Sequence, residues 1–328
     1  MLRTQYAFEQ KGGFGMVRKL LRSVREYKTS SLLAPLFVTC EVILEVIIPM
    51  LMANLIDFGI EAGNMQYILK MGLALVICCI VSLTFGALSG KYAAVASAGF
   101  AKNLREDMYN KVQEYSFSNI DKFSTASIVT RLTTDITNIQ NAYMMSIRVA
   151  VRCPIMLIFA LFMAFQINSH LAPIFVIAIP ILAVGLVIII SNAKRIFERV
   201  FRTYDKLNNV VQENLHGIRV VKSFVREDHE TEKFCSVSKE IYQDFSKAEK
   251  ILAFNAPLMQ FCAYGCMLLI SWLGAKLIVA SGNNPAVGMT TGDLTSMFSY
   301  TMQILMSLMM FSMVFVMISM SIASARRI

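Results

Sequence analysis

The sequence predicts an all-α membrane protein with six transmembrane helices, long cytoplasmic helical extensions and an N-terminal elbow helix. Of its 328 residues, 56% are apolar and only 16% are charged, and the mean hydropathy is +0.56. A soluble domain carries roughly a quarter charged residues. The apolar residues are gathered into long runs, each near the ~20 residues that a helix needs to cross a bilayer. These runs occupy residues 32–56, 66–90, 147–166, 171–191, 256–280 and 294–322.

The distribution of Lys and Arg predicts the orientation of these helices. Residues 1–30, 95–152, 192–250 and the C-terminal end hold 28 of the 31 Lys and Arg, whereas the loops near 57–66, 167–170 and 281–293 hold none. Loops rich in Lys and Arg stay in the cytoplasm. We therefore expect a multi-pass protein of the cell membrane, with both termini and both long loops in the cytoplasm. The net charge of +9 then reflects membrane topology, and no nucleic-acid partner is expected.

Two kinds of helix are expected beside the bilayer. Residues 14–28, within an N-terminal segment 1–30, place apolar side chains on one helical face and Arg and Lys on much of the rest. That pattern is typical of an amphipathic helix in the headgroup layer. The stretch from Gln66 to Tyr115 lacks proline and predicts one helix about 75 Å long, against a hydrocarbon core of about 30 Å. Residues 191–215 and 230–250 show a similar mixed-charge pattern, so the extensions are expected to act as levers moved by a soluble partner.

Each long cytoplasmic loop turns at a short segment, near 115–125 and near 213–224. Both segments carry apolar residues far from the bilayer, and an amphipathic segment at the tip of a helical hairpin can dock into a groove of a partner. Ordinary polar turns are the alternative interpretation. The apolar candidates for docking are Phe117, Ile120 and Phe123 in the first segment, and Leu215, Ile218, Val221 and Phe224 in the second.

Three motifs in order carry a resemblance to a known family. The run from Glu213 to Glu227 resembles the second intracellular loop of ABC exporters, where a short coupling helix lies in a groove of the nucleotide-binding domain. Residues 131–135, RLTTD, resemble the family's "SRLTND" stretch, and residues 323–328 resemble the end of its sixth helix. The resemblance implies an ABC exporter transmembrane domain of the type IV exporter fold over residues 31–328. The resemblance also implies four further coupling residues beside the apolar ones, namely Asp121, Glu213, Gly217 and Arg219.

The same resemblance has two departures. Ser127 and Ile128 stand where many family members have Gly-Glu, and this variant looks like one subunit type of bacterial heterodimeric multidrug exporters. No G-x-x-x-x-G-K-[ST] motif occurs, so no segment is expected to bind a nucleotide phosphate. We therefore expect no catalytic residue and no cofactor in this chain. ATP and Mg would bind a nucleotide-binding domain that is missing here, whether removed or on another chain, and the complete assembly would be a transporter ATPase.

Several residues inside the apolar runs are candidates for a substrate cavity. Glu41 and Glu45 share one helical face, where ionisable groups usually face a bundle interior or a wet cavity. They either bind cationic substrates or protons, or pair with polar groups of a neighbouring helix. Arg148 and Arg152 have the same spacing near the cytoplasmic boundary and are interpreted as anchors that reach the interface. No metal site is expected, because the histidines lie on segments away from Cys262 and Cys266.

The last apolar run carries a stripe of methionines, whose flexible thioethers suit surfaces that accept many shapes. Contact with lipid or ordinary packing is the alternative. The members assigned to the cavity are Met302, Met306, Met309 and Met313, and Met317 and Met320 continue the stripe.

Together these features predict the transmembrane half of an ATP-driven exporter. It would move hydrophobic or amphipathic compounds (drugs, lipids or peptides) out of the cytoplasm by alternating access, with a second and non-identical transmembrane half. The alternative is an ion-coupled secondary transporter, but short loops and inverted repeats with broken helices would then be expected. An intramembrane enzyme that uses Glu41 and Glu45 would need a nucleophile–base pair or a metal set, which the sequence does not supply.

Overall fold

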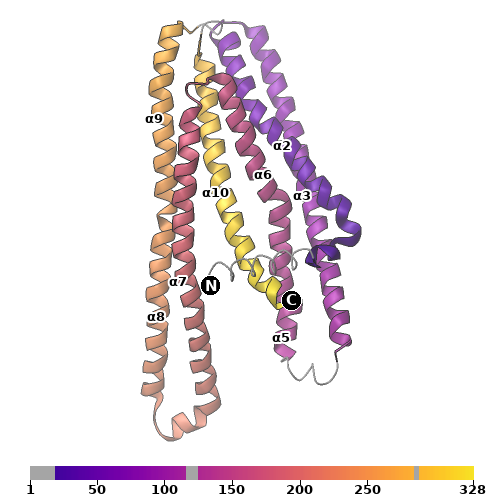
Figure 1. The fold of residues 1–328 in the computed structure, drawn as a ribbon, viewed down its shortest axis with the longest axis vertical. Helices are drawn as coiled ribbons and strands as arrows, with labels where there is room; N and C mark the ends of the chain where they lie inside the picture. The colour runs from indigo at the N-terminus through magenta and orange to yellow at the C-terminus, as the bar shows by residue number, and fades with distance from the viewer. Residues whose placement is uncertain (1–18, 116–124, 284–287) are drawn as a thin grey trace, which may run out of the picture. The chain divides into compact units, whose positions relative to one another are not determined.

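The computed structural model describes residues 19–115, 125–283 and 288–328, and within these ranges every regular element is helical (Figure 1). The predicted all-α membrane fold is confirmed, because six helices of the described chain are long and apolar enough to cross a membrane. The elements are η1 (Leu21–Tyr27), α2 (Lys28–Leu55), η2 (Ile56–Ile60), α3 (Met65–Gln113), α5 (Thr125–Thr130), η3 (Arg131–Asp135), α6 (Ile136–Ile167), α7 (Pro173–Ser223), α8 (Glu227–Ala253), α9 (Asn255–Ser281) and α10 (Thr291–Arg327).

The second spanning helix, α3, is much longer than a bilayer is thick. Helix α3 has 49 residues without a break, which agrees with the helix predicted from Gln66 to Tyr115. It follows a turn in which Gly63 has a φ of +65°, and the side chain of Asn64 caps its first turn by accepting from the Tyr67 amide at 3.2 Å. A helix of this length spans about 75 Å, more than twice the thickness of the hydrocarbon core.

The described part of the predicted elbow departs from a regular amphipathic helix. Residues 1–18 lie outside the described ranges, and Leu21–Tyr27 forms a 3₁₀-helix that is broken at Arg25, where φ is +40°. Val24 is buried against Phe100 and Leu104 of α3. Ser23 donates to Asp107 at 2.7 Å. The apolar side of this segment is therefore used for packing on α3.

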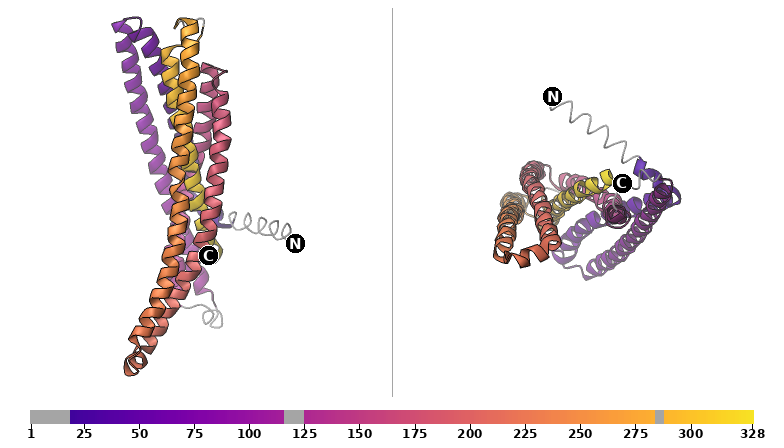
Figure 2. Two further views of the ribbon diagram at one scale, coloured as in Figure 1. Left: turned by 90° about the vertical axis from the view of Figure 1, so that its left-hand side faces the viewer. Right: turned by 90° about the horizontal axis from the view of Figure 1, so that it is seen from below.

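The described chain divides into two compact units. The first comprises residues 1–176 and 266–328, and in it α2 packs against α3 and α6 while α10 packs against α6 and α2. The second comprises residues 177–265, in which α7 and α8 run side by side (Figures 1 and 2). Arg199 pairs with Asp244 at 3.5 Å between these two helices, and Phe197 meets Phe245 edge to face.

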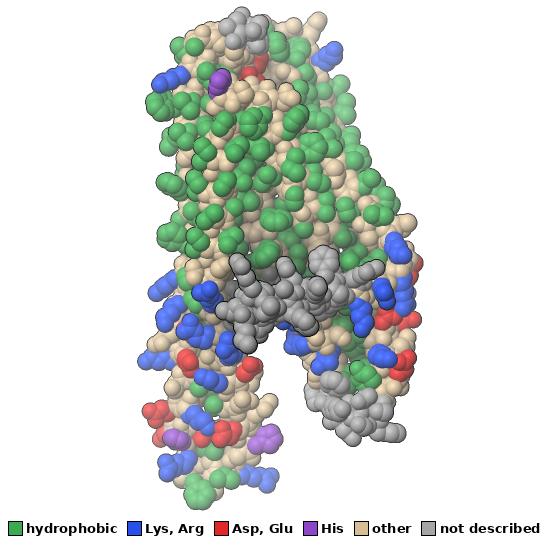
Figure 3. All heavy atoms as spheres, in the orientation of Figure 1, with side chains coloured by type: hydrophobic (Ala, Val, Ile, Leu, Met, Phe, Trp, Pro, Cys, Tyr) green, Lys and Arg blue, Asp and Glu red, His purple; other side chains and the backbone are tan. Residues whose placement is uncertain are grey.

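The surface separates apolar from charged side chains along the helices. Figure 3 shows hydrophobic side chains covering the apolar parts of the helices and Lys, Arg, Asp and Glu gathered toward the ends that carry the long loops. On α3, Leu69, Leu73 and Leu83 are each more than 60% exposed. Such an exposed apolar surface requires a bilayer, so the chain is a multi-pass membrane protein.

Candidate functional site

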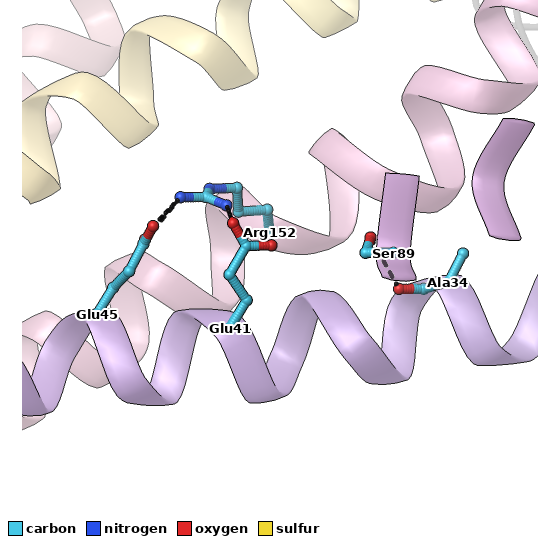
Figure 4. Close-up of polar contacts among 5 residues, drawn as sticks. All are labelled: Ala34, Glu41, Glu45, Ser89 and Arg152. Carbon is cyan, nitrogen blue, oxygen red and sulfur yellow. Dashed lines mark hydrogen bonds and ion pairs between the residues drawn. The ribbon is translucent and has the colours of Figure 1, made fainter. Parts of the chain in front are cut away.

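A charged triad lies inside the first unit, where α2 meets α6. Glu41 and Glu45 project from consecutive turns of α2 toward Arg152 of α6 (Figure 4). Arg152 Nη1 donates to Glu41 Oε1 at 2.7 Å, and Nη2 donates to Oε1 and Oε2 of Glu45 at 2.7 and 2.6 Å. One guanidinium therefore bridges two carboxylates, and the triad carries a formal charge of −1 at neutral pH.

The two glutamates differ in their surroundings. Glu41 is 9% exposed, and its Oε2 is buried without a hydrogen-bond donor among the described residues. The side chains of Glu45 and Arg152 are 28% and 25% exposed. Gly86 of α3 leaves room for the Glu41 carboxylate, because a Cβ at position 86 would lie 3.1 Å from Glu41 Oε1. A buried acceptor with no partner is costly in an apolar setting, which makes Glu41 unusual.

The structure corrects the interpretation of Arg152 as an anchor at the membrane boundary. Arg152 points to the glutamates, so the pairing that was the second alternative for Glu41 and Glu45 is what the structure shows. Arg148 lies one turn away with its guanidinium beside Gly90, and it forms no ion pair within the described ranges. A single arginine therefore serves both glutamates, and the four-residue spacing of Arg148 and Arg152 did not predict this pairing.

A row of hydrogen bonds joins α2 to α10 next to the triad. Pro49 has no N–H, so the carbonyl of Glu45 loses its partner inside α2. Gln303 of α10 donates to that carbonyl at 3.2 Å, and Tyr300 donates to the carbonyl of Val46 at 2.8 Å. Ser296 donates to the carbonyl of Pro49 at 2.6 Å. Gln303 thus satisfies the carbonyl that the proline leaves open, as membrane helices require, and Tyr300 and Ser296 add further bonds between the two helices.

A second cluster that the sequence reasoning missed lies at the start of α10. The Asp57 carboxylate accepts from the Thr290 hydroxyl at 2.6 Å and from the Gly292 amide at 2.9 Å. Glu61 accepts from Asn283 and Thr291. Acidic groups favour the N-terminus of a helix because its first amides are unpaired. The end of α2 and the η2 turn are therefore held to the first turn of α10.

The predicted methionines occupy different environments on α10. Met302, Met306 and Met313 are 41%, 53% and 68% exposed, whereas Met309 is half-buried. Met310, which the sequence reasoning left out, is also exposed. A separate apolar cavity of about 270 Å³ lies between α6 and α10 and contains none of the predicted glutamates or methionines. Its lining residues are Cys153, Pro154, Leu157, Ile158, Ser307, Leu308 and Phe311.

The two predicted coupling segments differ in how much of each the structure describes, and the second continues a long helix. Phe117, Ile120, Asp121 and Phe123 lie outside the described residues. Residues 213–223 are the last turns of α7 and do not form a separate short helix. The chain then turns through Val225, whose φ is +52°, and α8 begins at Glu227.

The tip of the α7–α8 pair, defined as residues 213–231, has exposed apolar side chains. Leu215 and Phe224 are 65% and 74% exposed, and Ile218 is 37% exposed. Ile218 also borders, with Val221, a groove of about 350 Å³ between the two helices. Glu213 of α7 pairs with Lys233 of α8 at 2.8 Å, and this ion pair links the two helices next to the tip. A Cβ added at Gly217 would meet no atom within 4 Å, and Arg219 is exposed.

Two of the sequence motifs meet in the structure. Arg327, from the C-terminal motif, donates to the buried Asp135 of the RLTTD motif at 2.6 Å. Asn138 donates to Ser324 at 3.2 Å, and Ser321 donates to the Asn138 carbonyl at 3.3 Å. The end of α10 is therefore fastened to the start of α6. No group of three metal-ligating side chains occurs in the part of the chain that the structure describes.

This arrangement agrees with a known family. The sequence model of the family described as the ABC transporter transmembrane region matches residues 31–309, which is most of the chain. The chain therefore belongs to the ABC transporter transmembrane family, and the resemblance seen in its motifs is confirmed.

Individual relatives support the same assignment. The chain is 28% identical over 312 residues to the uncharacterised ABC transporter ATP-binding protein YfiB of Bacillus subtilis, covering 95% of this chain and 53% of YfiB. It is 27% identical over 321 residues to the uncharacterised ABC transporter ATP-binding protein Rv1273c of Mycobacterium tuberculosis, with the same shares. It is 22% identical over 257 residues to an ATP-dependent lipid A-core flippase of Pseudoalteromonas translucida, covering 78% of this chain and 44% of the flippase. The chain thus spans about half the length of the first two relatives.

Proposed function

We propose that the chain is the transmembrane half of an ATP-driven exporter that moves hydrophobic or amphipathic compounds out of the cytoplasm by alternating access. The observation that carries the proposal is the tip of the α7–α8 pair, where apolar side chains are exposed at the end of two long charged helices. Exposed Leu and Phe at such a position suit docking into the groove of another domain. The relatives YfiB and Rv1273c are both named as ABC transporter ATP-binding proteins, which supports a nucleotide-binding domain as this partner.

The partners of the chain follow from the same proposal. ATP and Mg would bind the nucleotide-binding domain, and a second transmembrane half, non-identical by the Ser127-Ile128 variant, would complete the pathway. Exposed methionines on α10 support a surface that accepts varied apolar compounds. The concentration of Lys and Arg in the long loops supports a cell-membrane location with both termini in the cytoplasm. An ion-coupled secondary transporter would leave the exposed apolar tip without a role.

A charge placed in the tip tests the docking step. Ile218→Asp in the complete assembly should reduce both transport and transport-coupled ATP turnover, because an aspartate would be desolvated in an apolar groove. Tyr242→Asp is the matched control, since Tyr242 is 72% exposed on α8 within the same unit and lies outside the tip. Normal transport by Ile218→Asp at normal expression would refute docking at this position.

A further inference from the structure

Arg152 makes more hydrogen bonds to Glu45 than to Glu41, and this difference separates the roles of the two glutamates. Arg152 Nη2 contacts both oxygens of Glu45, whereas Nη1 contacts only Oε1 of Glu41. Oε2 of Glu41 is thus a buried acceptor without a donor among the described residues. If Arg152 released Glu45, both of its Nη groups would have an acceptor on Glu41. That bidentate Arg–carboxylate pair is a strong and geometrically specific interaction.

Accessibility distinguishes the two carboxylates. Glu45 is the more exposed of the pair, and Glu41, one turn away on α2, is nine-tenths buried against Gly86. An incoming ligand therefore meets Glu45 first. The charge of the triad, −1, leaves one negative charge that Arg152 does not neutralise. Arg148, the nearest other cation described on α6, faces Gly90 one turn away, and α10 contributes the uncharged Gln303 next to Glu45.

We propose that Glu45 is the carboxylate that contacts a cationic substrate and that Arg152 is its internal counter-ion, which moves fully onto Glu41 when the substrate binds. This inference rests on the proposed exporter function and names the substrate class as monovalent organic cations with an apolar body. The substrate's positive charge replaces Nη2 at Glu45. Nη2 then gains the unpaired Oε2 of Glu41, so no charge is left without a partner. Met302 and Met306 are exposed close to Gln303 on α10 and would supply the apolar contact for the body of such a substrate.

Two double variants test this assignment with equal charge. E41Q/R152M and E45Q/R152M each leave the triad with one carboxylate, and its formal charge stays at −1. The assay measures binding of the monocation tetraphenylphosphonium and of the neutral triphenylphosphine oxide to the purified full assembly in lipid nanodiscs without ATP. Binding of the neutral compound and the thermal melting temperature report whether each variant is folded. R148M is the control, because it removes an arginine of the same helix that makes no ion pair among the described residues.

The expected results separate Glu45 from Glu41. E41Q should weaken tetraphenylphosphonium binding, because Arg152 then has no second carboxylate, and adding R152M should restore it. E45Q should weaken the same binding, and adding R152M should not restore it. We expect the affinity of E45Q/R152M to be about tenfold below that of E41Q/R152M, a difference of about 1.4 kcal/mol. R148M should bind as the wild type does.

Several outcomes would overturn the inference. Equal affinity of the two double variants, tighter binding by E45Q/R152M, or wild-type protein that binds both compounds alike would each contradict it. If the double variants fail to fold, E45Q alone decides, because tetraphenylphosphonium binding as strong as in the wild type would exclude Glu45 as the contact. Failure of the exporter function shows separately, as an assembly whose ATP turnover drives no transport of either compound.

Discussion

Replacing Gly292 by alanine should loosen the junction between α2 and α10. An ideal Cβ at position 292 would lie 2.4 Å from the carbonyl oxygen of Ala53 and 2.7 Å from both carboxylate oxygens of Asp57. The first of these neighbours is backbone, so it cannot rotate away as a side chain does. The first turn of α10 must therefore move outward and lose the hydrogen bond from the Gly292 amide to Asp57.

The size of the effect follows from two terms. Overpacking a close contact costs about 1–3 kcal/mol, and loss of a helix cap costs about 0.5–2 kcal/mol. The expected total for G292A is about 2–4 kcal/mol, which corresponds to a melting temperature lower by about 4–8 °C in a chain of this size. The measurement is thermal unfolding of the purified transporter in detergent, followed by loss of the monodisperse peak in size-exclusion chromatography.

Gly72 supplies the matched control for this experiment. It lies within α3, and a Cβ there would meet no atom within 4 Å. Alanine favours a helix over glycine by about 1 kcal/mol, so G72A should melt at the same temperature or slightly higher. The error of the assay is taken as roughly 1 °C. If G292A melts within that range of the wild type, the predicted clash at position 292 is refuted. An equal decrease for G72A would refute it as well.

Three further predictions concern other contacts. Tyr300→Phe removes the hydroxyl that donates to the Val46 carbonyl, so stability should fall by about 1 kcal/mol and the melting temperature by about 2 °C; no change would show that this hydrogen bond contributes nothing. Arg327→Met leaves the buried Asp135 without its cation and should cost about 1–3 kcal/mol, whereas adding Asp135→Asn should recover part of that loss; a double variant less stable than Arg327→Met would contradict the ion pair. Single cysteines near Glu230 and Asn283, in a background without the seven native cysteines, should react from opposite sides of the membrane in intact cells; labelling at 230 by an impermeant reagent from outside would overturn the topology.

The sequence was sufficient for the helices because their signals are local. Apolar runs of bilayer length and the lack of proline between Gln66 and Tyr115 predicted α3 to within two residues at its end. The clustering of Lys and Arg likewise needed only a count along the chain. None of these inferences depended on which helix packs against which.

The sites were harder to predict because they depend on contacts between distant segments. Arg152 was interpreted as a boundary anchor, since its position in an apolar run does not show that α6 faces Glu41 and Glu45. The donors of α10 to the backbone near Pro49 were missed for the same reason. The segment 213–224 was expected as a separate helix, but the backbone continues α7 past Gly217 to Ser223 and turns only at Val225, where φ is +52°.

Glu45 belongs to two sets of contacts at once, and this has a mechanical consequence. Its backbone carbonyl is tied to Gln303 of α10, while its side chain is tied to Arg152 of α6. The stretch of α2 around Pro49 is held to α10 by hydrogen bonds, which leaves it little freedom to act as a hinge. A tilt of α10 would pull on the main chain of Glu45 and change the distance between its carboxylate and Arg152. Movement of α10 and the ion pairing of the triad are therefore coupled through this one residue.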